Sequence, residues 1–197
     1  QDQTRGRRWW VASSGSFALA LMSKATAMTL PLALLILDAY PLRRLHLAPR
    51  RLWLEKAPYA LLAAAAAVVA YVGQAKAGAM SYQNHDLFLR IGQAAYGLIF
   101  YLRKTLFPAG LSPLYEMPPL AASMLAPFAL SAVVTAAITV ALIKVRRRWP
   151  SALSAWVYYA VTLAPVSGIV SYGMQITADR YSYLAGMSWP LLAGGGL

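Results

Sequence analysis

Cations and tyrosines, with few carboxylates among them, are the residues of this chain most able to do chemistry. Lysine and arginine form charge-assisted hydrogen bonds with phosphate oxygens, and aromatic faces pack on sugar rings. The mixture predicts a site for a sugar linked to a phosphate. The members outside the basic clusters are Lys24, His85, Asp86, Arg90, Arg103, Lys104, Tyr115, Glu116, Asp179, Arg180, Tyr181 and Tyr183.

Glu116 and Asp179 are the carboxylates that we retain as weak candidates for a catalytic base. Each also has a structural explanation, because Glu116 could cap a helix or pair with a cation, and Asp179 could cap a helix start. His85 and Asp86 are adjacent and have no third ligand at a suitable spacing, so they indicate a polar loop rather than a metal site. No cofactor is evident, and the sequence leaves a divalent metal open.

Lys24 stands in the apolar stretch "LMSKATAMTLPLALL" and allows two interpretations. It could contact a phosphate, since ionisable residues within membrane segments are functional candidates. It could equally be an interfacial lysine whose amine reaches water while its stem stays in apolar surroundings. In "TADRYSY", Arg180 could engage an anionic ligand while Asp179 orients a neighbour or caps the next helix.

The composition is typical of an α-helical membrane protein. Of 197 residues, 59% are hydrophobic and 12% charged, and the mean hydropathy is +0.52. The net charge of +12 comes from short clusters beside apolar segments, which favours cytoplasmic loops over nucleic-acid binding. There is no cysteine, hence no disulfide or thiol nucleophile. Walker, dinucleotide and serine-nucleophile motifs are absent from the sequence.

We expect residues 1–197 to form part of one transmembrane domain, an all-α polytopic bundle cut from the interior of a longer protein. If the basic clusters at 5–8, 43–51 and 146–148 are cytoplasmic, the first two spans form a hairpin whose outer turn is Ser23–Lys24. Asp38 then lies near Arg43 and Arg44 as their structural partner. The predicted spans are 9–22, 25–42, 57–75, 124–143, 151–170 and 183–197.

With the basic clusters on the cytoplasmic side, the span 57–75 runs outward and the span 124–143 runs inward. Residues 76–123 are therefore predicted to lie outside the membrane, with an interfacial amphipathic helix at 87–105. The alternative, that 87–107 is a true span with Arg103 and Lys104 at its inner end, stays open. The polar face of this helix is predicted to carry Arg90, Gln93, Gly97, Tyr101 and Lys104, and the other face Phe88, Ile91, Ala95, Leu98 and Leu102.

The order of motifs resembles that of GT-C membrane glycosyltransferases. "SFALALMSKATAMTLPLALLILDAYPL", "LWLEKAPYALLAAAAAVVAYV", "YLRKTLFPAGLSPLYEMPP" and "ADRYSYLAGMSW" follow one another as in bacterial relatives of the transmembrane and tetratricopeptide-repeat protein O-mannosyltransferases. The resemblance covers nearly the whole chain. It departs from the family at Ala185 and Gly186, where relatives often carry Leu-Pro or Pro-Ser.

The resemblance implies a multi-span enzyme that passes a sugar from a polyprenyl-phosphate donor to an acceptor protein or glycan. Lys24 would contact the lipid phosphate, and Arg180 with Tyr181 would line the donor site. The family's catalytic carboxylate follows its first span, so we expect the base to lie outside residues 1–197, and a repeat array after Leu197. The predicted substrate-binding residues are Lys24, Arg90, Arg103, Lys104, Tyr115, Arg180 and Tyr181.

Two other functions compete with this interpretation. A lipid-linked saccharide transporter or flippase would need charges along a membrane path, yet apart from Lys24 and Asp38 the predicted spans carry almost none. An O-antigen ligase or polymerase-like enzyme also pairs a large external loop with arginines. In each case we expect an integral protein of a bacterial inner membrane, with the site on its periplasmic face and no nucleic-acid partner.

Overall fold

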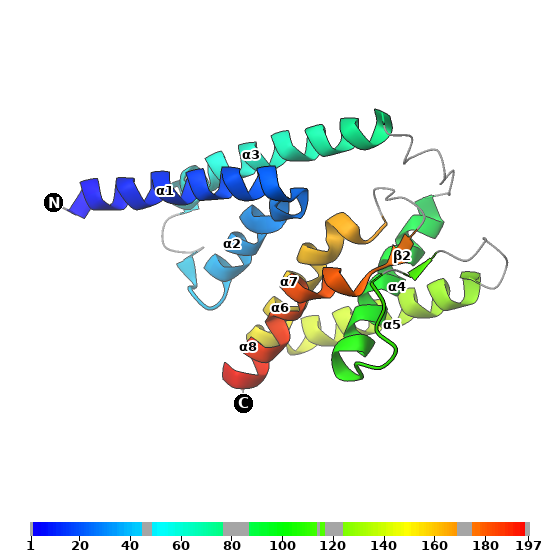
Figure 1. The fold of residues 1–197 in the computed structure, drawn as a ribbon. Helices are drawn as coiled ribbons and strands as arrows, with labels where there is room; N and C mark the ends of the chain where they lie inside the picture. The colour runs from blue at the N-terminus through cyan, green and yellow to red at the C-terminus, as the bar shows by residue number, and fades with distance from the viewer. Residues whose placement is uncertain are drawn as a thin grey trace. The chain divides into compact units, whose positions relative to one another are not determined.

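The computed structural model describes residues 2–44, 49–76, 87–113, 115–116, 124–168 and 175–195. The chain forms two compact units, residues 1–73 and residues 74–197. Nearly all of the described secondary structure is helical, which confirms the predicted class (Figure 1). One short antiparallel strand pair is added to it.

In its described residues, the N-terminal unit consists of α-helices and a 3₁₀ turn (Figure 1). Helices α1 and α3 lie side by side and run in the same direction. Tyr59 donates a hydrogen bond to Ser13 Oγ at 2.9 Å, and its ring centroid lies 5.6 Å from that of Phe17. The elements are α1 (Asp2–Ser23), the 3₁₀ turn η1 (Ala25–Thr29), α2 (Leu30–Ala39) and α3 (Pro49–Lys76), whose last residues extend beyond the unit.

The hairpin predicted for the first two spans agrees with this arrangement. Helix α1 ends at Ser23, and the second segment of the hairpin, formed by η1 and α2, begins at Ala25. The turn therefore falls at Lys24 as expected. The second segment starts as a 3₁₀ turn, in which Thr29 donates from its hydroxyl to Thr26 O at 3.2 Å. Pro31 then stands in the first turn of α2, where its missing N–H costs no helical hydrogen bond.

The C-terminal unit is built around helix α4 (Leu87–Leu106). Tyr159 donates to Leu98 O at 2.7 Å, which ties α6 to α4. Trp156 donates from Nε1 to Thr139 Oγ1 at 3.0 Å, which ties α6 to α5. The further elements are β1 (Tyr115–Glu116), α5 (Leu125–Val145), α6 (Pro150–Leu163), η4 (Ala164–Val166), β2 (Gln175–Thr177), η5 (Asp179–Tyr181), α7 (Ser182–Gly186) and α8 (Ser188–Gly195).

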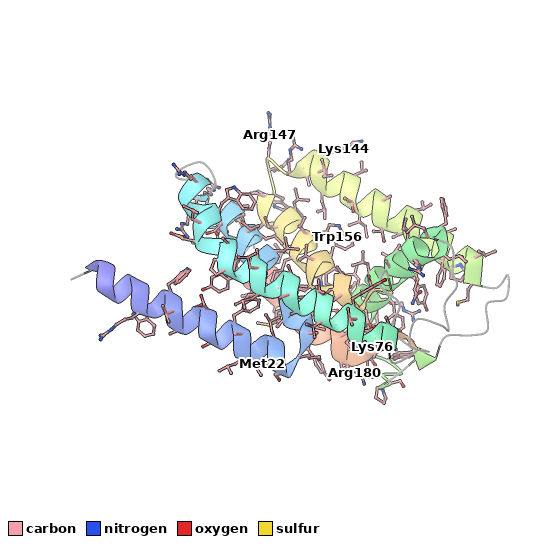
Figure 2. All side chains as sticks on the ribbon, turned by 90° about the horizontal axis from the view of Figure 1, so that it is seen from above. Met22, Lys76, Lys144, Arg147, Trp156 and Arg180 are labelled. Atoms are coloured by element: carbon pink, nitrogen blue, oxygen red, sulfur yellow. The ribbon has the colours of Figure 1, made fainter. Side chains whose placement is uncertain are left out.

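Aromatic residues dominate the core of this unit. Trp189 packs against Trp156 and Tyr159, with ring centroids 6.4 and 5.1 Å away. Figure 2 shows Trp156 within the unit and Lys144 and Arg147 at the far end of α5. The buried members of the core are Phe100, Tyr101, Trp156, Tyr159, Leu163 and Ala185.

Helix α4 matches the predicted bounds, but its predicted polar face is turned inward, while the predicted apolar face is divided between buried Ala95 and exposed positions. Gln93, Gly97 and Tyr101 from the predicted polar face are buried, whereas Phe88 is 85% exposed and Ile91 55% exposed. Tyr101 faces inward because its hydroxyl finds a hydrogen-bond partner there. Gly92 lets Phe128 approach the same helix closely, since a Cβ at this position would lie 3.0 Å from Phe128 Cβ. The expectation of a water-facing polar stripe on α4 is therefore wrong.

In the described part of the chain, two helices are long and apolar enough to cross a membrane, Leu52–Lys76 and Leu125–Val145. They match the predicted spans 57–75 and 124–143. Only 11% of the most apolar window of each is buried, unlike the core helix of a soluble protein. Of the other expected spans, 9–22 lies within the continuous helix α1, which is not among the two candidates. The remaining three are shorter or interrupted, because α2 ends at Ala39, α6 ends at Leu163, and the last segment is divided at Met187. Their crossing of a membrane stays a prediction.

Candidate functional site

A cluster of polar side chains forms where α4 ends. Strands β1 and β2 pair antiparallel, with Tyr115 opposite Thr177 and Glu116 opposite Gln175. This pairing brings the loop that follows α4 next to the start of η5. Three of the residues predicted from sequence, Lys104, Tyr115 and Asp179, are thereby brought together, although 64 residues separate Tyr115 from Asp179.

Asp179 anchors the loop to the η5 turn. Its Oδ2 accepts a hydrogen bond from the backbone N–H of Ser112 at 2.6 Å and one from the hydroxyl of Tyr115 at 3.0 Å. No side chain caps η5, whose N-cap residue is Ala178. The suggestion that Asp179 caps a helix is therefore wrong, because its carboxylate bridges to a distant segment instead.

Tyr115 contacts both sides of this junction. Its hydroxyl lies 2.8 Å from Gly110 O and 3.0 Å from the Asp179 carboxylate. A phenol has one hydrogen to donate, and the charged carboxylate is the stronger acceptor. The ring meets Phe100 edge-on, with centroids 4.9 Å apart and planes at 74°. The side chain is thus fixed at both its ring and its hydroxyl.

Lys104, near the end of α4, binds the loop that follows this helix. Its Nζ donates to Ala109 O at 2.5 Å and to Gly110 O at 2.7 Å. The same ammonium lies over the rings of Phe100 and Tyr115, 5.6 and 5.3 Å from their centroids. Two of its three hydrogens are engaged by backbone carbonyls, so the residue has a clear structural task beside any contact with a ligand.

Tyr101 connects the helix to the segment that precedes Asp179. It is 2% exposed, and its hydroxyl oxygen accepts a hydrogen bond from the N–H of Ala178 at 2.9 Å. Burial raises the pKa of Tyr101 above its ordinary value, because the charged phenolate would be poorly solvated. The residue therefore stays a neutral phenol and acts as a structural partner.

Arg180 is the exposed cation of the cluster (Figure 2). Its guanidinium carbon lies 5.2 Å from the ring centroid of Tyr181, and Nη2 lies 3.4 Å from the Tyr181 hydroxyl. Stacking on the ring holds the guanidinium in place and leaves donor hydrogens directed elsewhere. The guanidinium can therefore bind an anionic group with little loss of conformational entropy.

The remaining predicted residues lie in several environments. Arg103 and Tyr183 are exposed, Arg90 is half-buried, and Lys24 is exposed at its turn in the N-terminal unit. Glu116 belongs to β1. Its side chain, together with His85 and Asp86, lies outside the described residues. Among described residues, no group of three His, Cys, Asp or Glu side chains could hold a metal ion.

Asp38 is buried in the N-terminal unit and pairs as predicted with Arg44, whose Nη1 lies 3.2 Å from Oδ1. Its second partner was missed: Lys56 Nζ lies 2.9 Å from Oδ2 as an ion pair. Arg43, the other expected partner, is exposed and pairs with no carboxylate in the described part of the chain. Arg44 also reaches Glu55, at 3.1 Å.

Sequence reasoning missed Ser112 and Phe100 as members of the cluster at the end of α4. The contact from Ser112 is a backbone N–H, so its residue type carries no signal. Phe100 lies on the core side of α4 and has the pattern of any packed aromatic residue.

No family model, curated protein or solved structure matches this chain.

Proposed function

We propose that the chain is part of an integral-membrane glycosyltransferase that moves a sugar from a polyprenyl-phosphate donor to an acceptor hydroxyl. The observation that carries the proposal is that an exposed, ring-stacked Arg180 directly follows Asp179, which is anchored to another segment. One residue supplies a positioned cation for a phosphate, and the other fixes the segment that presents it. The order of motifs in the sequence supports the same class of enzyme.

The exposed apolar surface supports a membrane location. Soluble monomers rarely expose large contiguous apolar areas, yet the faces of α3 and α5 are apolar and largely uncovered. Examples are Val69, Val72, Leu130 and Val133. In a bilayer these side chains would contact lipid, which removes the cost of exposing them to water. We propose a bacterial inner membrane with the site on its periplasmic face.

The proposed reaction is an inverting displacement at the anomeric carbon of the donor sugar. The acceptor oxygen forms a bond to this carbon while the bond between the carbon and the phosphate oxygen breaks. The electron pair leaves with the polyprenyl phosphate, and a carboxylate takes the proton of the acceptor hydroxyl. Arg180 would stabilise the charge that develops on the phosphate. Lys24 is proposed as a second phosphate contact, as the sequence resemblance implies.

The contacts of Asp179 favour a positioning role over the role of base. Its Oδ2 already accepts two hydrogen bonds, from the backbone N–H of Ser112 and the hydroxyl of Tyr115, so this oxygen is engaged by the protein itself. We propose that the base is a carboxylate outside residues 1–197. Arg180 and the other proposed substrate-binding residues then bind and orient the donor, while a residue elsewhere in the full-length protein removes the proton.

Binding of the lipid phosphate tests this proposal without a choice of sugar. The full-length protein in lipid nanodiscs is titrated with undecaprenyl phosphate and with undecaprenol. We expect the phosphate to bind at least about tenfold more tightly, and Arg180→Ala to remove most of this difference, since a hydrogen bond to a charged group contributes about 1.5–3 kcal/mol. Arg180→Lys should retain part of it.

Arg147→Ala is the matched control, because it removes one exposed arginine from a different end of the same unit. It should leave the preference for the phosphate unchanged. Equal binding of undecaprenyl phosphate and undecaprenol by the wild-type protein would contradict the proposal. So would a preference that survives both Arg180→Ala and Lys24→Ala.

A further inference from the structure

One end of the N-terminal unit combines exposed arginines with exposed tryptophans. Trp10 donates from Nε1 to Glu55 O at 3.4 Å, so the first third of α1 lies beside the start of α3. The ion pairs of Asp38 with Arg44 and Lys56 bring the end of α2 to the same place. We call this region the basic end; it comprises Arg8, Trp9, Trp10, Arg43, Arg50 and Trp53.

The carboxylates at the basic end are already engaged. Asp38 is bound by Arg44 and Lys56, and Glu55 lies 3.1 Å from Arg44. Within the described part of the chain, no carboxylate pairs with Arg8, Arg43 or Arg50, all three of which are exposed. The basic end therefore carries an excess of accessible positive charge.

The tryptophans determine the kind of anion that suits this surface. Trp9 is 69% exposed, Trp10 42% and Trp53 61%. Indole rings favour the boundary between lipid chains and headgroups, where guanidinium groups meet the phosphates of the lipids. A soluble acidic protein or a free phosphate would engage the arginines but leave the indoles in water.

We infer that the basic end binds the headgroups of anionic phospholipids, with the indoles between the headgroups and the lipid chains. The inference rests on the membrane location in the proposed function but concerns a different surface and a different lipid. Basic clusters beside membrane helices attract anionic lipid with a free energy that grows with each cation. Phosphatidylglycerol is the probe with which we test it.

The absence of cysteine from this chain allows a local probe. Leu54, exposed beside Trp53, is replaced by cysteine in the full-length protein, freed of any other cysteine, and labelled with a bimane fluorophore. The protein is reconstituted with brominated phosphatidylglycerol or brominated phosphatidylcholine at equal bulk fractions, because bromine quenches the fluorophore on contact. We expect phosphatidylglycerol to be enriched at the probe by at least about threefold, and added salt to reduce the enrichment.

The triple variant Arg8→Ala, Arg43→Asn, Arg50→Ala should lose the enrichment. Asparagine is used at Arg43 because this residue has φ of 50°, a region that asparagine tolerates. Lysine at all three positions should retain the enrichment. The control Lys144→Ala, Arg146→Ala, Arg147→Ala removes equal charge from the other unit and should leave it unchanged.

Four outcomes would overturn the inference. The first is equal quenching of the wild-type protein by the two brominated lipids, a measurement that depends on no variant. The second is enrichment that persists in the triple variant. The third is equal loss in the control variant, which would indicate a general charge effect. The fourth is displacement of phosphatidylglycerol by millimolar glycerol phosphate, which would show that the surface takes soluble phosphate. Sugar transfer is independent of all four, so failure here is distinguishable from failure of the proposed function.

Discussion

The hydroxyl of Tyr115 lies 3.0 Å from Oδ2 of Asp179, across a separation of 64 residues. The same oxygen accepts the backbone N–H of Ser112. Asp179 therefore joins the loop after α4 to the turn that carries Arg180. Because the arginine follows directly in the chain, the position of the exposed cation depends on this junction.

The contact between Tyr115 and Asp179 predicts coupling in a double-mutant cycle. Tyr115→Phe should lower the free energy of unfolding by about 1–2 kcal/mol, and Asp179→Ala by about 2–3 kcal/mol, because the latter also leaves the Ser112 N–H without its acceptor. The double variant should be less destabilised than the sum, with a coupling of about 1 kcal/mol. Unfolding in detergent micelles measures all three.

Tyr183→Phe is the control for this cycle, because Tyr183 is 77% exposed. Its effect should stay within about 0.5 kcal/mol. Strict additivity of the Tyr115 and Asp179 substitutions would show that the two side chains do not stabilise one another.

Asp38 is expected to be the most sensitive acidic residue of the N-terminal unit. Its side chain is 2% exposed, and that of Lys56 is 13% exposed, so Asp38→Ala leaves a largely buried ammonium without its carboxylate. We expect a loss of about 3 kcal/mol in the free energy of unfolding. Glu55→Gln should cost less than about 1 kcal/mol, because both Glu55 and Arg44 are accessible to water. Equal effects of the two substitutions would contradict this difference.

Gly168 is predicted to resist substitution for two separable reasons. Its φ is +88°, and a Cβ at this position would lie 2.5 Å from the amide group of the buried Gln93. Gly168→Ala should therefore destabilise the protein by more than about 1 kcal/mol. Adding Gln93→Ala should recover the steric part and leave the backbone part. If the destabilisation of the double variant equals the sum of the two single effects, the alanine at 168 and the side chain of Gln93 do not clash. Thermal unfolding of the two single variants and the double variant distinguishes these outcomes.

The topology can be read by single cysteines labelled from one side of the membrane. A cysteine at Ser23 should react from outside, and one at Arg147 only after permeabilisation. For α4, cysteines at Leu87 and Ala109 mark the two ends, and both positions are exposed. Labelling of both from outside supports the interfacial prediction for 87–105. Labelling from opposite sides would show that this helix crosses the membrane.

Helix positions could be predicted from the sequence because apolar segments and their basic flanks are local features. The turn at Lys24 and the bounds of α4 and α5 agree with the expectations. The inward direction of the polar face of α4 could not be predicted, because the pattern separates two faces without saying which one meets other helices. Tyr101 carries a polar hydroxyl, yet it is buried because the backbone N–H of Ala178 supplies a hydrogen-bond partner for it.

The candidate site could be predicted by residue type but not by role. The sequence indicated Lys104, Tyr115, Asp179 and Arg180 as a group. Lys104 binds backbone carbonyls, and Asp179 binds a distant N–H. Both contacts depend on the pairing of β1 with β2, two very short strands that have no recognisable sequence pattern.

For Asp38, the second partner Lys56 could have been expected, since a buried carboxylate needs enough positive charge nearby.

Sugar transfer by the full-length protein tests the central proposal most directly. Proteoliposomes containing the protein are supplied with undecaprenyl-phosphate mannose that carries a labelled sugar, and label joined to acceptor hydroxyls is measured. We predict transfer by the wild-type protein and by Arg147→Ala, and a loss of at least about tenfold in Arg180→Ala and Lys24→Ala. Absence of transfer by the inserted wild-type protein would contradict the proposal, as would transfer at the wild-type rate in both of these variants.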